Sequence, residues 1–267
     1  MQADDLLREG NPRAALASLQ EAVRRDPASS AYRVFLFQLL ALNGEWERAG
    51  TQLEVLAKMD PATSAMGIAY SAALNSEVLR AEIFAGRRTP LVFGEPEEWV
   101  AWLVQALKLD AEGKPRAAAE LRARAFDAAP AVPGGVDGTP FNWIADGDSR
   151  LGPVLEAIVQ GRYCWVPFPR IRELRTEKPA DLRDLVWLPA EFTWANGGTA
   201  PALLPVRYVG SEASDDGLVQ LARKTDWRRI DEDTYVGLGQ RMLVTDEGEH
   251  PLLDVRAITF PAPPSGA

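Results

Sequence analysis

The sequence predicts an α+β fold, in which helical repeats over residues 1–130 are followed by a smaller mixed α/β domain. Two observations support this prediction. One frame of residues, with Gly first, Ala five positions later and Pro seventeen positions later, occurs at residues 10–27, 44–61 and 113–130. After residue 139 the alanine-rich pattern gives way to Trp, Pro and short apolar runs of the length of strands.

Each copy of the frame predicts one helix of a stack. Ala15, Ala49 and Ala118 let a neighbouring helix approach closely, and larger apolar residues such as Leu56 and Phe126 follow about two turns later. The proline at the end of each copy cannot continue the helix. The three copies therefore predict helices of similar length that pack through an alanine face.

The spacing of the frame has a period. The first two copies start 34 residues apart and the next two 69 apart, close to twice that period. A 34-residue period resembles the tetratricopeptide repeat, in whose second helix Trp46, Ala49 and Leu53 occupy matching positions. The resemblance implies a first helix in each unit, for which residues 31–42 and 98–109 have the required apolar pattern.

Parts of the array depart from the frame. Residues 3–9 supply only a remnant of a first helix, so the array is expected to begin with a partial unit. Residues 64–86 predict another helix, but the frame is lost at residues 86–96, where Pro and Gly predict a loop. A helix pair over residues 95–129 is expected to complete the array.

The second half begins with a predicted linker at residues 131–139, followed by a domain at residues 140–260. Predicted helices are residues 153–160 and 216–227, the latter capped by Ser214 or Asp215. Predicted strands are residues 162–168, 184–194, 202–209, 235–245 and 252–260, with turns at residues 196–198 and 246–248. The tail, residues 261–267, is expected to be disordered.

Composition excludes several classes of protein. A net charge of −9 argues against a nucleic-acid partner, because phosphate neutralisation needs clustered cations. Cys164 is the only cysteine and His250 the only histidine, so we expect neither an internal disulfide nor a zinc cluster. No cofactor is expected. The N-terminus has no basic region followed by an apolar stretch, and no window approaches a membrane span, so we expect a cytoplasmic protein.

Asp146 and Asp148 form the densest acidic site beside a predicted helix start. They could bind a divalent metal or act as an acid and base, with Asp184 or Glu191 nearby, which is the basis of an alternative hypothesis of a metal-dependent hydrolase. The structural interpretation is favoured: both side chains satisfy backbone donors in a tight loop, with Arg150 as counter-charge. No catalytic or metal-binding residue is therefore assigned.

Two other patterns carry little functional weight. Gly237 and Gly239 match the first two glycines of a dinucleotide-binding motif, but the third is absent. Cys164 and His250 could pair as nucleophile and base, yet Cys164 lies between Tyr163 and Trp165 in an apolar run, which favours a buried, inert thiol. No GxSxG, Walker or HExxH motif occurs.

Five tryptophans lie in the second half of the chain. Most are expected in the core, while one or two at the surface would suit a protein partner. They are Trp143, Trp165, Trp187, Trp194 and Trp227.

Five segments of the second half together resemble one known family. They are FNWIADGDSRLGPVLEAIVQGRYCWVPFPRI, DLRDLVWLPAEFTWANGG, LLPVRYVGSE, LARKTDW and YVGLGQRMLVTDEGE. The chain, over about residues 1–260, resembles the ImpE family, also called SciE or TagJ, an accessory component of bacterial type VI secretion systems.

The resemblance implies a cytoplasmic, non-enzymatic scaffold. Its implied partner is the small subunit of the contractile sheath, bound through that subunit's N-terminal helix. The resemblance also implies an influence on how the unfoldase ATPase handles contracted sheath. It supplies no catalytic residues, and neither it nor the residue patterns indicate which residues bind the partner.

Overall fold

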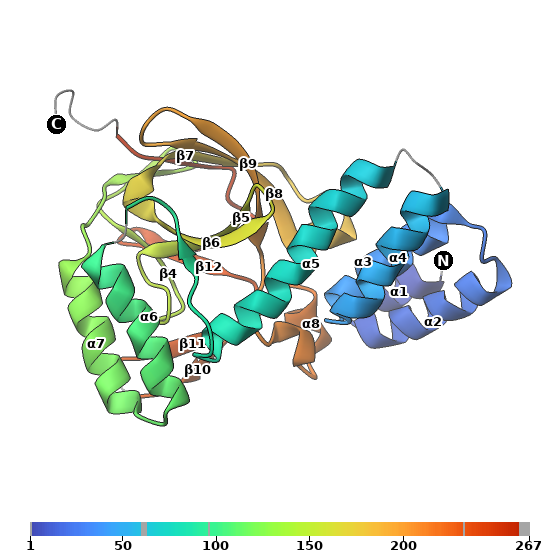
Figure 1. Ribbon diagram of the computed structural model, residues 1–267, viewed down its shortest axis with the longest axis horizontal. Coiled ribbons are helices and arrows are strands. Elements are labelled where there is room, and N and C mark those ends of the chain that lie inside the picture. Colours follow the sequence, from blue (N-terminus) through green and yellow to red (C-terminus); the bar gives the residue numbers. More distant parts are fainter. Residues whose placement is uncertain (1, 60–62, 96, 232, 262–267) are drawn as a thin grey trace.

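The computed structural model describes residues 2–59, 63–95, 97–231 and 233–261, and it contains two groups of helices around a large curved sheet (Figure 1). Helices α1 to α5 extend to one side, and the hairpin of α6 and α7 lies at the other end of the sheet. The helices are α1 (Gln2–Arg8), α2 (Pro12–Arg25), α3 (Ser30–Leu42), α4 (Trp46–Met59), α5 (Ser64–Phe84), α6 (Glu98–Ala111), α7 (Pro115–Ala128) and α8 (Gly217–Gln220).

The repeat frame has the predicted structural role. Gly10, Gly44 and Gly113 adopt φ angles of 81°, 76° and 72°. Only glycine takes this left-handed conformation at low cost, and each of these glycines lies in the turn that precedes a frame helix. The three frame alanines are completely buried. The sequence prediction of tetratricopeptide-like N-terminal helices is confirmed.

The array is interrupted after α5. Residues 86–96, predicted to be a loop, contain the short strand β1 (Leu91–Val92), which pairs in parallel with β6 (Arg162–Pro167). The chain therefore joins the edge of the sheet before α6 begins. As a result, α6 and α7 form a separate hairpin instead of continuing the stack (Figure 1).

Nine strands form the main sheet, in the order β1-β6-β5-β9-β8-β7-β14-β2-β3. A three-stranded sheet, β13-β12-β4, and the hairpin β10-β11 complete the β-structure of the described residues. The remaining strands are β2 (Gly134–Val136), β3 (Thr139–Phe141), β4 (Ile144–Asp146), β5 (Val154–Val159), β7 (Ile171–Thr176), β8 (Trp187–Trp194), β9 (Thr199–Pro205), β10 (Thr225–Arg229), β11 (Tyr235–Gly239), β12 (Met242–Thr245), β13 (Gly248–Pro251) and β14 (Ala257–Thr259).

The helix predicted at residues 153–160 is wrong. These residues form β5, which lies between β6 and β9 and has every side chain buried. A strand buried on both faces is a nearly continuous apolar run, here interrupted only by Glu156, so it lacks the alternation that distinguishes a strand from a helix. Gln160 and Gly161, with φ angles of 50° and 74°, form the turn to β6. Gly161 therefore marks a hairpin rather than a helix end.

The helix predicted at residues 216–227 is also mostly wrong. Only the four residues of α8 are helical, and their cap is Asp216, whose carboxylate accepts a hydrogen bond of 2.8 Å from the N–H of Leu218. Ala222 adopts a φ of 52°, which ends the turn. The chain then extends as β10 and pairs with β11, so tertiary pairing overrides the local helical pattern.

Other predicted boundaries need correction. The predicted linker, residues 131–139, contains β2, which pairs with β3 and β14. Residues 182–185 form a short 3-10 helix, so the strand predicted at residues 184–194 starts later, at Trp187. The strand predicted at residues 235–245 is divided into β11 and β12, and β12 pairs with β13 rather than with residues 252–260. Of the predicted tail, residues 262–267 lie outside the described residues.

The repeat helices share a hydrophobic core with one face of the sheet, and a second core lies within the β-structure. The ring of Trp187 on β8 lies 5.8 Å from that of Tyr70 on α5 and 6.1 Å from that of Trp46 on α4, centroid to centroid. Trp165 on β6 packs similarly against Phe84. The Arg207 side chain donates a hydrogen bond of 2.8 Å to the carbonyl of Leu42 at the end of α3. The repeat helices α4 and α5 thus pack against the chain's own sheet.

Candidate functional site

The acidic loop singled out in the sequence lies between β4 and β5, where both aspartates are buried. The Asp146 carboxylate accepts hydrogen bonds from the Tyr208 hydroxyl at 3.0 Å and from the backbone N–H of Asp148 at 2.8 Å. The Asp148 carboxylate accepts from Arg150 Nε at 2.8 Å and from the N–H of Gly237 at 3.1 Å. The predicted structural role of this loop is therefore observed, including Arg150 as counter-charge.

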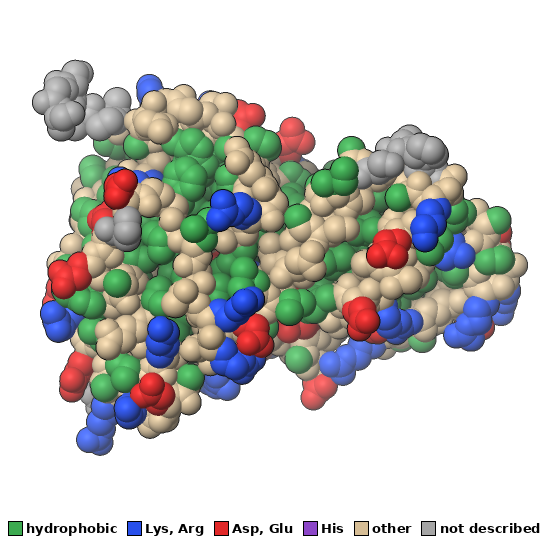
Figure 2. Space-filling view, viewed as in Figure 1, with side chains coloured by type: hydrophobic (Ala, Val, Ile, Leu, Met, Phe, Trp, Pro, Cys, Tyr) green, Lys and Arg blue, Asp and Glu red, His purple; other side chains and the backbone are tan. Residues whose placement is uncertain are grey.

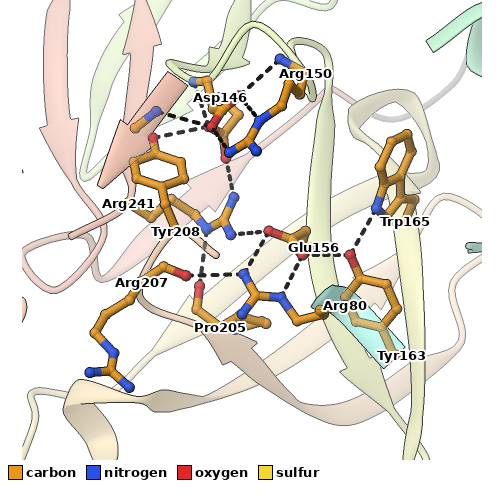
Figure 3. A network of polar contacts seen from close by, with 12 residues as sticks. Arg80, Asp146, Arg150, Glu156, Tyr163, Trp165, Pro205, Arg207, Tyr208 and Arg241 are labelled. Carbon is orange, nitrogen blue, oxygen red and sulfur yellow. Dashed lines mark hydrogen bonds and ion pairs between the residues drawn. The ribbon is translucent and has the colours of Figure 1, made fainter. Parts of the chain in front are cut away.

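The loop is one end of a larger buried ionic network (Figure 3). The completely buried guanidinium of Arg241 forms ion pairs with Asp146 and with Glu156 of β5. Glu156 also accepts two hydrogen bonds from Arg80 of α5, at 2.7 and 3.0 Å, and one from the Tyr163 hydroxyl. Two arginines and two carboxylates thus alternate through the centre of the molecule.

The network continues into the helical repeats. Arg80 Nη1 donates a hydrogen bond of 2.7 Å to Glu77, and Glu77 accepts a second hydrogen bond, of 2.9 Å, from the indole N–H of Trp187. Arg80 also donates to the carbonyl of Arg207 at 3.0 Å. Because α5 supplies Glu77 and Arg80 while the β-rich second half of the chain supplies the rest, the network fixes α5 against that half.

The two central carboxylates have different electrostatic environments. Burial raises the pKa of Asp146 to about 6, since desolvation outweighs the attraction of Arg241. Burial acts in the same direction on Glu156, but the two guanidiniums of Arg80 and Arg241 outweigh it and lower its pKa to about 2. Burial disfavours the charge of Arg241, yet Asp146 and Glu156 together raise its pKa above the ordinary value.

The acidic residues considered for metal binding do not converge. Asp184 caps the 3-10 helix by accepting hydrogen bonds from the N–H groups of Ala180 and Asp181, each at 2.9 Å, and Glu191 lies on β8 with an exposed side chain. Within the described ranges, no three His, Cys, Asp or Glu side chains are grouped so that they could hold a metal ion. The carboxylates of Asp146 and Asp148 are instead held by arginines.

The other candidates are also separated. Cys164 is buried on β6, and burial raises the pKa of its thiol to about 12, which keeps it protonated. His250 lies on β13 of another sheet, with its ring nitrogen 3.1 Å from the Thr245 hydroxyl. Gly237 lies on a strand rather than in a phosphate-binding loop, where a Cβ would approach the Tyr208 ring to 2.3 Å. Its lack of a side chain therefore serves packing.

Four members of this network were not predicted from the sequence: Glu77, Arg80, Glu156 and Arg241. A signal was available for two of them. Glu156 interrupts the apolar run VLEAIV, and Arg80 follows Val78 and Leu79 in a largely apolar helix. A charged residue in a buried apolar run predicts a partner of opposite charge, although the sequence does not say which.

The tryptophans divide as predicted. Trp165, Trp187 and Trp194 are buried, whereas Trp143 and Trp227 are 40% and 37% exposed. Trp143 lines a cavity of about 340 Å³ together with Phe126, the backbone around Gly147, and Pro153. This cavity lies between the end of α7 and β4.

The sequence of this chain is similar to that of known protein families. Residues 138–259 match the family described as ImpE protein, and residues 6–71 match a tetratricopeptide repeat family. The chain is 53% identical over 260 residues to the type VI secretion system accessory component TagJ of Pseudomonas aeruginosa strain PAO1, covering 97% of this chain and 91% of TagJ.

A solved structure has the same fold. The crystal structure of protein VPA1032 from Vibrio parahaemolyticus superposes with a TM-score of 0.91 at 27% sequence identity, covering 99% of each chain. The interrupted helical array and the sheet are therefore found together in another bacterial protein. With the match to the ImpE profile and more than half of its residues identical to those of TagJ, the chain belongs to the ImpE family.

Proposed function

We propose that this chain is an accessory component of a bacterial type VI secretion system and acts without catalysis, as a cytoplasmic scaffold. Its proposed partner is the small subunit of the contractile sheath, bound through that subunit's N-terminal helix. Through this contact it influences how the unfoldase ATPase handles contracted sheath. The observation that carries the proposal is the 53% identity to TagJ over almost the whole of both chains.

The architecture supports a binding role. Helical hairpins present long, rigid surfaces that suit a peptide or helix. The network around Arg241 fixes α5 to the sheet, so a partner would meet one preformed surface rather than two mobile parts. No helix in the described part of the chain combines the length and apolarity needed to cross a bilayer.

The buried network also supports a non-catalytic role. A catalytic carboxylate must reach substrate, whereas Asp146, Asp148 and Glu156 are almost fully buried and each is paired with arginine. The thiol of Cys164 is buried as well. These groups stabilise the fold and leave the surface for binding.

Isothermal titration calorimetry tests the proposal. The full-length chain is titrated with a synthetic peptide of the sheath subunit's N-terminal helix, and saturable binding with a negative heat-capacity change is expected, because a helix of this kind buries apolar surface. A peptide of the same composition in scrambled order is the control. No interaction with either the helix peptide or the intact sheath would contradict the proposal.

A further inference from the structure

A groove of about 810 Å³ lies between α5, α6 and the turn that joins β5 to β6. Along α5 it is lined by Ala72, Asn75 and Leu79, which are three and four residues apart and so share one helical face. Leu91 of β1, 45% exposed, adds an apolar contact at the sheet edge. We call this the α5 groove.

The α5 groove is strongly basic in an acidic protein. Its lining includes Arg87, Arg88, Lys108 and Arg162 and no acidic side chain, although the whole chain has a net charge of −9. Arg87 is paired with Glu82 at 2.7 Å. For the other three, all exposed, no ion pair is found among the described residues. In Figure 2, Lys and Arg side chains gather beside the C-terminal half of α5.

Two other nearby acidic residues form ion pairs with cations outside the groove. Asp110 is paired with Arg122 at 2.6 Å and Glu112 with Lys114 at 2.7 Å, both on or beside the α6–α7 hairpin. The positive charge of the groove is thus left for a partner, and it attracts an anionic surface more strongly than the rest of the chain does.

The interruption of the repeat array explains why the α5 groove is open. The face of α5 that carries Arg80 is covered by the sheet, and α4 covers another. A second helix of the same repeat would follow α5 directly, but residues 86–96 join the sheet edge instead and α6 pairs with α7. Among the described residues, this flank of α5 has no helix packed closely against it, and α6 borders it only across the groove.

We propose that an amphipathic helix bearing acidic residues docks in the α5 groove, with its acidic side chains facing Arg88, Lys108 and Arg162. Its occupant is the sheath-subunit helix, so this inference rests on the proposed function and assigns a surface to it. Ala72 and Leu79 lie seven positions apart on α5, about 10 Å along the helix axis, which matches two turns of a docked helix. The apolar face of that helix meets Leu79 and Leu91.

Charge reversal at the groove tests this inference. The triple variant Arg88→Glu, Lys108→Glu, Arg162→Glu is compared with the wild-type chain by calorimetry against the helix peptide. We expect the Kd to rise by on the order of 10-fold or more, and the wild-type Kd to rise with ionic strength. A peptide with its Asp and Glu replaced by Asn and Gln should bind the wild-type chain equally weakly.

A matched control separates the groove from net charge. The triple variant Lys58→Glu, Arg116→Glu, Arg228→Glu changes the net charge by the same amount at exposed positions outside the groove, and it should retain wild-type affinity. Thermal melts of both variants verify that they fold, as expected for exposed side chains.

Each outcome has a distinct meaning. Unchanged binding by the groove variant, or equal loss in the control, would overturn the α5 groove assignment and leave the proposed function intact. Loss of binding in Trp143→Ala with no loss in the groove variant would place the helix in the 340 Å³ cavity instead. A wild-type chain that fails to bind the peptide would contradict the proposed function itself.

Discussion

Arg80 and Glu156 are 76 residues apart in the sequence and form a two-point ion pair, with Arg80 Nε 2.7 Å from Oε1 and Nη2 3.0 Å from Oε2. Arg80 belongs to the helical repeats and Glu156 to β5, an interior strand of the main sheet. Their side chains are 3% and 0% exposed, so neither charge can be left unpaired without a large cost.

The first prediction concerns this pair. Arg80→Ala leaves Glu156 with one guanidinium fewer in a buried site, and should lower the free energy of unfolding by about 3 to 5 kcal/mol. Urea denaturation measures the change. Arg8→Ala removes the exposed pair with Asp5 and should cost less than about 1 kcal/mol. Similar losses in the two variants would show that the network does not stabilise the fold.

The second prediction concerns pH. The folded pKa of Asp146, about 6, lies above its ordinary 3.8, so the folded protein binds this proton more tightly than the unfolded chain does. Its contribution is fully present below pH 3.8 and is lost as the pH rises through 6, by roughly 3 kcal/mol. Glu156, whose pKa is lowered from 4.5 to about 2, has the opposite effect, because its contribution to stability increases as the pH rises from about 2 to 4.5. Above pH 4.5 the effect of Asp146 can therefore be measured separately.

Denaturant melts between pH 4.5 and 7 test this. The free energy of unfolding of the wild-type chain, relative to that of Asp146→Asn, should fall across this range, because the variant lacks the titrating group. Asp215→Asn, at a side chain that is 99% exposed, should run parallel to the wild type. A constant difference between wild type and Asp146→Asn would contradict the electrostatic assignment.

The third prediction concerns the repeat frame. Leu53 is 2% exposed, so Leu53→Ala should leave a cavity and lower the free energy of unfolding by roughly 2 to 5 kcal/mol. Ala49 is completely buried, so Ala49→Leu should overpack the contact between helices and lower the free energy of unfolding by on the order of 1 to 3 kcal/mol. Thr51→Leu, at an exposed position of the same helix, should cost under about 0.5 kcal/mol. Denaturant melts should give this rank order, and equal losses at Ala49 and Thr51 would mean that the packing face is assigned incorrectly.

The fourth prediction compares two glycines. A Cβ on Gly237 would lie 2.3 Å from the ring of Tyr208, which is held by its hydrogen bond to Asp146, so Gly237→Ala should destabilise by about 1 to 3 kcal/mol. Gly67 lies within α5 with open space around it, so Gly67→Ala should stabilise by roughly 0.5 to 1 kcal/mol. Thermal melts that show the same sign for both would disprove the packing argument at Gly237.

The helical repeats follow from local sequence patterns alone. Helical periodicity, frame glycines and stop prolines act within about one helical turn of themselves, so residues 12–25, 46–59 and 115–128 could be predicted without any tertiary contact. The family also follows from the sequence, because the motifs that carry the resemblance are contiguous in the chain.

Three features depend on tertiary contacts instead: the identity of β5, the path of the chain after α5, and the ionic network. A strand buried on both faces has the same apolar composition as a buried helix, and only its pairing with β6 and β9 distinguishes them. The network joins Arg80, Glu156 and Arg241, which come from three distant segments. Which buried charges neutralise each other depends on how the segments meet in space, and that information is not local to any stretch of the chain.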